Sequence, residues 1–286
     1  MNWFKTMILM SLLTAFMVAI GNYIGGSTFA YIMLAVSLGI NLISYWFSDK
    51  IVLATSGAHE VDADSEPVLY NIVARLAKNA DLPMPRVYII DEPAPNAFAT
   101  GRNPSHAAVA ATRGLLDMLD ENELSGVLGH ELAHVKHRDI LIGTVAAMMA
   151  GVISMLANFV FISNSDDDDG GGNFIGNLLI LFLAPIAASL IQLAISRSRE
   201  YDADKTGGEI CGNPLYLASA LEKIEEYAQN QMPLQVATTA TAHMYIINPL
   251  ANSRQKLKNL FSTHPLTSDR IARLREQVAV AGRSPQ

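Results

Sequence analysis

The sequence predicts a mainly α-helical membrane protein in which four transmembrane helices carry a soluble α+β domain with a small β-sheet. Three observations support this fold class. Half of the 286 residues are hydrophobic and only 16% are charged, against about 25% in ordinary soluble domains. Three stretches, 6–48, 141–165 and 173–196, contain no Asp, Glu, Lys or Arg, and about 20 apolar residues suffice to cross a bilayer. The remaining segments carry helical and strand-like patterns.

The first uncharged stretch is expected to form a helical hairpin, so that residues 1–48 supply spans one and two. The stretch is too long for one span, and the turn-forming residues at 21–27 divide it into two halves of bilayer length. A cleaved signal peptide is the alternative, because Lys5 and the apolar run 7–20 resemble its first two regions. A second apolar run follows directly, which favours the hairpin.

Residues 141–196 are expected to form a second hairpin, spans three and four, joined by an acidic outer loop at 163–177. That loop holds four aspartates and no basic residue, whereas Lys5 and the segments 49–140 and 197–286 hold all 20 basic residues. The positive-inside rule then places both termini in the cytoplasm. The aspartate run could also be imagined as a calcium loop, but it lacks the spaced ligands and the closing glutamate of one. The single cysteine, Cys211, cannot form an internal disulfide, so nothing points to an oxidising compartment.

The segments 49–140 and 197–286 are expected to fold together as one cytoplasmic domain. Periodicity and short apolar runs predict a helix at 66–80 and strands at 87–90, 97–99 and 107–112. Asp120 followed by Glu123 resembles a capping box that opens a helix running through 129–139.

In the second segment, Asn213 before Pro214 predicts a helix that reaches about residue 229. Another helix is expected from about Ser268. Residues 231–263 have weak periodicity and are left without an assignment.

The pattern His130-Glu131-Leu132-Ala133-His134 carries the most chemical information in the chain. Histidines four residues apart lie one turn above each other on a helix, so both imidazoles can reach one zinc ion. Glu131 borders the position of a metal-bound water, where a general base belongs. Chance placement predicts roughly 0.007 occurrences of this pattern in such a chain. The alternative is a solvated helix face with scattered histidines.

A catalytic zinc site normally has three protein ligands, so a third ligand has to come from elsewhere. The candidates are His106, His137, His243, His264 and the acidic residues of 199–204. Glu200 is the best placed, because a hairpin of spans three and four delivers its two ends side by side. Asp204, one turn further on, is expected to accept a hydrogen bond from a zinc-bound histidine. These acidic residues could instead pair with Arg197 and Arg199 on an exposed helix.

Histidine 137 is expected to lie at the membrane interface rather than on the metal. It follows His134 by three residues, about 4.5 Å further along the helix axis, and the glycine and third histidine of the metzincin pattern are absent. Lys136 and Arg138 beside it are expected to anchor the helix at anionic head groups.

Four motifs together resemble the HtpX family of bacterial inner-membrane zinc metallopeptidases, which is related to the CAAX prenyl proteases. They are the segments 130–139 (HELAHVKHRD), 196–204 (SRSREYDAD), 96–101 (NAFATG) and 262–265 (STHP) with Arg270. The resemblance covers the whole chain in order.

The resemblance implies a gluzincin-like zinc metallopeptidase domain with one Zn²⁺ per chain. It implies His130, His134 and Glu200 as the metal ligands and Glu131 as the catalytic base. It also implies that Asn96 and Phe98 belong to an edge strand that lines the substrate, and that His264 and Arg270 hold the substrate carbonyl or the developing oxyanion. Asn96 could instead cap a turn, and His264 could be a helix-entry residue.

The function implied is membrane protein quality control under stress, in which a zinc-dependent endopeptidase hydrolyses misfolded or damaged membrane proteins. The expected location is the inner membrane, with the active site and both termini in the cytoplasm. The expected partners are the membrane and unfolded protein substrates, together with other membrane quality-control proteases, and no nucleic acid.

Three other readings remain to be weighed. A CAAX-type processing protease with one narrow substrate has more spans than the four counted here. A structural zinc protein would need a fourth protein ligand and would not need Glu131. A transporter is disfavoured because no ionisable residue lies within the spans.

Overall fold

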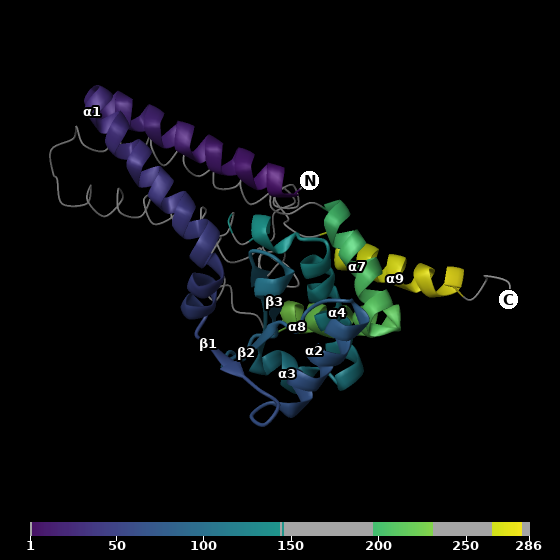
Figure 1. Cartoon of the computed structure of the whole chain (residues 1–286). Coiled ribbons are helices and arrows are strands. Elements are labelled where there is room, and N and C mark those ends of the chain that lie inside the picture. The colour runs from purple at the N-terminus through teal and green to yellow at the C-terminus, as the bar shows by residue number, and fades with distance from the viewer. Residues whose placement is uncertain (1, 144, 146–196, 231–264, 282–286) are drawn as a thin grey trace.

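A computed structural model describes residues 2–143, 145, 197–230 and 265–281 of the chain (Figure 1). The helices are α1 (Asn2–Thr55), α2 (Pro67–Asn79), α3 (Arg113–Met118), α4 (Glu121–Lys136), α7 (Arg197–Cys211), α8 (Pro214–Asn230) and α9 (Thr267–Ala281). The strands are β1 (Ala58–Val61), β2 (Arg86–Ile90), β3 (Ala97–Gly101) and β4 (Ala107–Thr112), and a short 3-10 helix, η1 (Pro104–His106), precedes β4. The predicted spans three and four, the acidic loop between them and the segment 231–263 lie outside the described residues.

Helix α1 is a hairpin of two long arms that projects from the rest of the molecule (Figure 1). Gly25 and Gly26 leave the helical conformation, and Gly26 has a φ of 66°, which glycine adopts at little cost. The amide of Asn41 on the second arm donates to the hydroxyl of Thr14 on the first at 2.9 Å. The turn therefore lies within the predicted segment 21–27, and both arms, Thr6–Tyr23 and Gly25–Thr55, are long and apolar enough to cross a membrane. The second arm continues past residue 48 as helix.

The sheet has four strands in the order β1-β2-β4-β3. Strands β2 and β4 are parallel, while β1 and β3 are antiparallel to their neighbours. The three predicted strands are all present, and β1 is an addition. Alternate residues of β4 point to opposite faces, as the pleat requires. Val109 therefore packs into the main core with α2 and α4, and Ala108 and Ala110 pack against the lower end of α1.

Helix α4 lies at the centre of the main core and packs against α2, α7, α8 and β3. Its start is the predicted capping box: the Asp120 carboxylate accepts from the backbone N–H of Glu123 at 2.9 Å, and the Glu123 carboxylate accepts from the N–H of Asp120 at 3.1 Å. Such a box satisfies amide groups that the first turn leaves without helical partners. The start of the helix that carries the HExxH pattern is thus set by local sequence.

The end of α4 differs from the prediction that the helix runs through residue 139. The helix stops at Lys136, and Arg138 adopts the left-handed conformation with a φ of 59°. The N–H of Arg138 donates to the carbonyl of Val135 at 3.1 Å, and the N–H of Asp139 donates to the carbonyl of His134 at 2.9 Å. These two bonds form a Schellman motif, which closes the last turn of a helix. A turn therefore separates α4 from the helical residues that begin at 140.

Candidate metal centre

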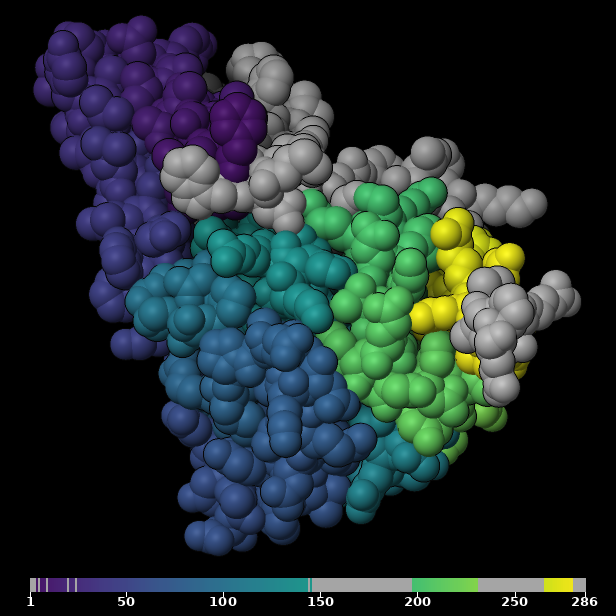
Figure 2. All heavy atoms as spheres, turned by 45° about the vertical axis from the view of Figure 1, so that its right-hand side comes forward, coloured from purple at the N-terminus to yellow at the C-terminus, as the bar shows by residue number. Residues whose placement is uncertain are grey.

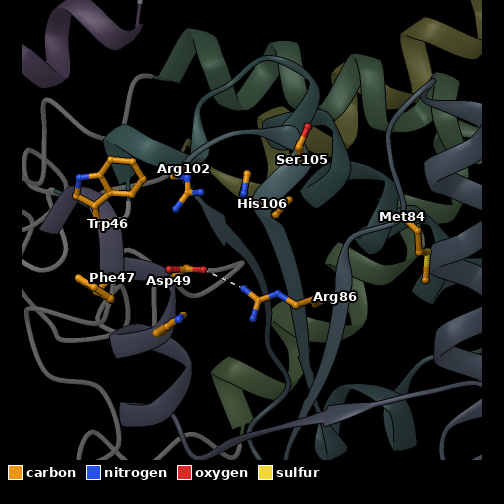
Figure 3. Close-up of a pocket in the computed structure, with 10 residues that line it drawn as sticks. Trp46, Phe47, Asp49, Met84, Arg86, Arg102, Ser105 and His106 are labelled. Atoms are coloured by element: carbon orange, nitrogen blue, oxygen red, sulfur yellow. Dashed lines mark hydrogen bonds and ion pairs between the residues drawn. The ribbon is translucent and has the colours of Figure 1, made fainter. Parts of the chain in front are cut away.

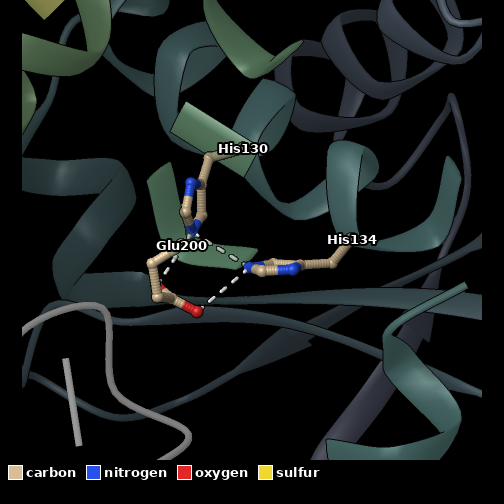
Figure 4. Close-up of side chains that lie close together, drawn as sticks. All are labelled: His130, His134 and Glu200. Carbon is tan, nitrogen blue, oxygen red and sulfur yellow. Dashed lines mark hydrogen bonds and ion pairs between the residues drawn. The ribbon is translucent and has the colours of Figure 1, made fainter. Parts of the chain in front are cut away.

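Three side chains from α4 and α7 converge on one point (Figure 4). The Nε2 atoms of His130 and His134 lie 3.2 Å apart. The Glu200 carboxylate lies 3.8 Å from Nε2 of His130 and 3.6 Å from Nε2 of His134. Ligands about 2.0–2.1 Å from a tetrahedral zinc lie about 3.3 Å from one another. The spacing of these three donors therefore matches a zinc site to within about half an ångström.

Glycines at the crossing of α4 and α7 bring these donors together. A Cβ added at Gly207 would lie 2.7 Å from both the Cα and the backbone N of His130. A Cβ added at Gly129 would lie 2.8 Å from the carbonyl oxygen of Gly207. The two backbones can approach this closely only because neither residue has a side chain. Figure 2 shows the part of the surface where α7, in green, lies against the teal segment of the chain.

Each imidazole also faces a carboxylate on the side away from the convergence point. Nδ1 of His130 donates to Oδ1 of Asp204 at 2.9 Å, and Nδ1 of His134 lies 3.5 Å from Oδ2 of Asp139. A carboxylate can only accept, so it favours the tautomer with the proton on Nδ1. That tautomer leaves the Nε2 lone pair of each ring directed at the shared point, as a metal requires.

The charge around the two imidazoles also suits a cation. Four buried carboxylates lie around the two rings, and the one buried guanidinium among the described residues is that of Arg270. The four are Glu131, Asp139, Glu200 and Asp204. An excess of buried negative charge is costly unless a cation neutralises it. The residues present therefore fit a divalent metal.

The pKa of His134 reflects this excess of negative charge. Burial by itself lowers that pKa, but the hydrogen bond to Asp139 and the charges of Glu200 and Glu131 outweigh burial and raise it to about 9. The carboxylates around His134 thus favour a positive charge at this point, here a proton on the imidazole.

Asp204 is held ionised by a second contact. Its carboxylate accepts from Nε of Arg270 at 2.9 Å and from Nη2 at 2.6 Å. Burial acts to raise the pKa of Asp204, but Arg270 and His130 outweigh burial and hold that pKa well below its usual range. Arg270 itself is 1% exposed. It lies behind His130, and its predicted role in binding substrate remains a prediction.

Glu131 lies on α4 beside the first histidine and contacts the edge of the sheet. Its Oε2 accepts from the backbone N–H of Ala99 on β3 at 2.9 Å. The side chain is 7% exposed. The carboxylate therefore lies at the edge of β3, on the helix that carries His130 and His134.

Asn96 and Phe98 are both buried at this edge and are held by different contacts. The backbone of Asn96 is held by Thr112, whose hydroxyl accepts from the Asn96 N–H at 2.8 Å. Phe98 packs with Val52 and Leu53 of α1 on the sheet face that turns away from the main core. The N–H of Ala99 points outward to Glu131, so the main-chain groups of Phe98 face β4 in this antiparallel pair.

The remaining histidines that the sequence offered as ligands lie elsewhere or outside the described residues. Nε2 of His137 lies 3.2 Å from the Thr206 hydroxyl on α7, which joins the end of α4 to its neighbour. His106 is exposed and its Nδ1 lies 2.9 Å from the Asn103 side chain. His243 and His264 are outside the described residues.

Sequence reasoning missed Asp139, because it treated 129–139 as one continuous helix. On such a helix, a residue five positions after His134 points to a different face. The left-handed turn at Arg138 brings Asp139 back beside His134.

Comparisons with known proteins agree with this geometry. The model of peptidase family M48 matches residues 63–278. Two curated relatives, each described as a protease HtpX homolog, are 56% identical. The one from Burkholderia thailandensis aligns over 96% of both chains, and the one from Methylibium petroleiphilum aligns over 97% of this chain and 98% of its own. The crystal structure of S. mikatae Ste24p is similar with a TM-score of 0.50 and 19% identity; the alignment covers 96% of this chain and 66% of that one.

Proposed function

Because the chain belongs to peptidase family M48 and is a metallopeptidase, we propose that it is a membrane-embedded zinc endopeptidase that hydrolyses misfolded or damaged membrane proteins. The observation that carries the proposal is the convergence of His130, His134 and Glu200 on one point. Glu131 lies beside that point, and the hydrophobic arms of α1 extend from the same domain.

In this proposal His130, His134 and Glu200 hold one zinc ion per chain. Zinc bound there supplies Lewis acidity, which polarises a carbonyl and lowers the pKa of a coordinated water. Asp204 and Asp139 keep the two imidazoles in the tautomer that presents Nε2 to the metal. Three protein ligands leave a coordination position for chemistry, whereas a structural zinc site is closed by four.

Glu131 acts as the general base and then as the general acid. Its carboxylate takes a proton from the attacking water and later passes it to the leaving amine, which is the usual contribution of a positioned carboxylate. The N–H of Ala99 donates to its Oε2, which fixes the carboxylate at the edge of β3. The other oxygen remains for the water.

The substrate is proposed to bind as an extended strand along β3. Strand β3 is at the end of the sheet order, with β4 on one side. Adding a strand to an edge recognises main-chain groups rather than side chains, which suits substrates of varied sequence. Asn96 and Phe98 are proposed to line this edge, whose outward main-chain groups belong to Ala97, Ala99 and Gly101. His264 with Arg270 is proposed to act on the substrate carbonyl.

The proposed location is the bacterial inner membrane, with the site on the cytoplasmic side. The basic residues outside the spans favour this orientation. Cytoplasmic loops and unfolded ends close to the bilayer would then reach the site first. A narrow processing role like that of a CAAX protease is the second candidate, and the likeness to Ste24p shows the fold alone.

The proposal is tested with detergent-purified protein and an unfolded substrate such as casein. The wild type should cleave casein only with zinc present. Glu131→Gln should keep one zinc per chain and lose roughly 10²-fold or more in rate, because the base is gone while the ligands remain. Glu209→Gln, an exposed position on α7, is the matched control and should behave as the wild type. Turnover retained by Glu131→Gln, or cleavage without zinc, would refute the proposal.

A further inference from the structure

A second hollow lies where the lower end of α1 meets the sheet, separate from the metal centre. It has a volume of about 500 Å³, within the usual range of ligand sites. Trp46, Phe47, Asp49 and Lys50 line it from α1, and further residues line it from the β2 start and the β3–β4 connection. We call it the interface pocket; Figure 3 shows its lining residues, with Arg86, Arg102 and His106 facing α1.

The charged groups of the interface pocket are mostly cationic. Lys50, Arg86 and Arg102 line it together with one carboxylate, Asp49. Asp49 is bound to Arg86 at 2.9 Å, which fixes the position of that guanidinium. The guanidinium of Arg102 lies over the ring of Trp46 at 4.8 Å. Both arginines are thus held in place, and the pocket keeps an excess of positive charge.

The pocket lies at the depth of lipid head groups if the second arm of α1 crosses a bilayer. A helix rises about 1.5 Å per residue, so about 20 residues cross the ~30 Å hydrocarbon core. Counted from the break at Gly26, 20 residues end at Trp46. Trp46 and Phe47 are 47% and 48% exposed, and tryptophan is enriched at the membrane–water interface. Asp49 and Lys50 follow at once, where the phosphates begin.

We propose that the interface pocket binds the phosphate of an anionic phospholipid head group in the leaflet at this end of α1. Arg86 and Arg102 come from the soluble domain and Lys50 from the membrane arm, so one phosphate contacts both parts. Arginine suits phosphate because its planar fork donates two parallel hydrogen bonds. Trp46 and Phe47 pack beside the glycerol and upper acyl region. The bound lipid thereby fixes the soluble domain against the membrane surface.

This inference rests on the proposed membrane insertion of α1 and is independent of proteolysis. Its test measures lipid binding to the delipidated full-length protein in neutral detergent, by native mass spectrometry and by the shift in melting temperature. Phosphatidylglycerol is compared with phosphatidylcholine and with inorganic phosphate. The wild type should bind one phosphatidylglycerol at least tenfold more tightly than phosphatidylcholine, and inorganic phosphate should give no comparable shift.

Substitutions in the interface pocket test whether the lipid binds there. Lys50→Gln with Arg102→Gln should weaken phosphatidylglycerol binding at least tenfold, while Lys50→Arg, which keeps the charge and leaves Arg102 unchanged, should retain it. The matched control removes two exposed cations from α2, as Arg75→Gln with Lys78→Gln, and should bind as the wild type.

Ser105→Glu adds a negative charge at an exposed lining position and should weaken binding without removing any packing. It keeps the test decisive where the double variant fails to fold. Equal binding of the two lipids, wild-type binding by both Ser105→Glu and the double Gln variant, or an equal effect of inorganic phosphate would overturn the proposal. A wild-type protein that binds phosphatidylglycerol but does not cleave casein would count against the proposed function alone.

Discussion

The carboxylate of Asp139 lies 3.5 Å from Nδ1 of His134, on the far side of the ring from Nε2, the proposed ligand atom. It reaches that position because Arg138 adopts a left-handed conformation and turns the chain back at the end of α4. Asp204 faces Nδ1 of His130 in the same way at 2.9 Å. Each histidine of the HExxH pattern therefore has its own carboxylate, one from the turn after α4 and one from α7.

Removal of the Asp139 charge should weaken metal binding. Asp139→Asn keeps the shape of the side chain but no longer favours the required tautomer of His134, and the loss of such a partner typically costs 10–100-fold in affinity. Zinc affinity is measured by competition with a chromogenic chelator. Asp117→Asn, at an exposed position on α3, is the control. Unchanged affinity in Asp139→Asn would show that the long contact does not orient the ring.

A methyl group at Gly207 should push α7 away from α4. The added Cβ would lie 2.7 Å from backbone atoms of His130, and such overpacking costs about 1–3 kcal/mol. We expect Gly207→Ala to melt at a lower temperature and to bind zinc more weakly, since Glu200 and His130 move apart. Gly143→Ala, where nothing lies within 4 Å, should have no such effect. Equal melting temperatures of the two variants would contradict the close contact.

Loss of Arg270 should strongly destabilise the domain. It would leave the Asp204 carboxylate buried with one partner fewer, and breaking a buried pair costs about 3–5 kcal/mol. Arg275→Gln removes an exposed partner of Glu222 and should cost about 0–1 kcal/mol. Denaturant unfolding of Arg270→Gln and Arg275→Gln at pH 7 checks the difference.

The contribution of Arg270 to the free energy of unfolding should also depend on pH. The pKa of Asp204 is lower in the folded protein than in the unfolded chain, where it is about 3.9. The pair therefore stabilises fully above about pH 4 and less as the pH falls below that value. The stability difference between the wild type and Arg270→Gln should shrink from pH 7 to pH 3. If the stability difference between the two proteins stays constant over this pH range, the Arg270–Asp204 pair is not its source.

Cys211 should react slowly with thiol reagents in the folded protein. It is 6% exposed, and burial raises the pKa of its thiol, so that little thiolate forms near pH 8. It is the one cysteine in the chain, which makes labelling by a maleimide easy to follow by mass. We expect fast labelling only in denaturant. Labelling of the native protein at the rate of a free thiol would show that the α7–α8 junction is open.

Local sequence predicted the elements that are determined by local interactions. The capping box of Asp120 and Glu123, the proline at the start of α8 and the runs that form β2 and β4 all gave elements close to the observed ones. Strand β1 was missed because four residues with two exposed charged or polar side chains form a strand only through pairing with β2. The end of α4 was missed because a left-handed arginine has no sequence signature comparable to glycine.

The pattern 130–134 predicted that two imidazoles share one face of a helix, and in the structure their Nε2 atoms lie 3.2 Å apart. The partners of these histidines were harder to predict, since they depend on packing between segments far apart in the chain. The contact of Gly129 with Gly207 and the pairing of Arg270 with Asp204 join residues 66 or more positions apart. Neither glycine stands out in the sequence, because a glycine inside a helix gives no sign of the backbone that approaches it.

Two consecutive residues of β3 connect helix α1 to the carboxylate of Glu131, the proposed base. Phe98 packs on Val52 and Leu53 near the foot of α1, and the next N–H, that of Ala99, holds Glu131. If α1 tilts to match a thinner bilayer, it would move Phe98. Because Ala99 is the next residue, the same movement would shift Glu131. Peptidase rates in vesicles of different acyl-chain length, compared for wild type and Phe98→Ala, measure this coupling, and identical profiles would exclude it. Membrane thickness would then change the peptidase rate by moving the proposed base, Glu131, although the lipid contacts lie outside the site.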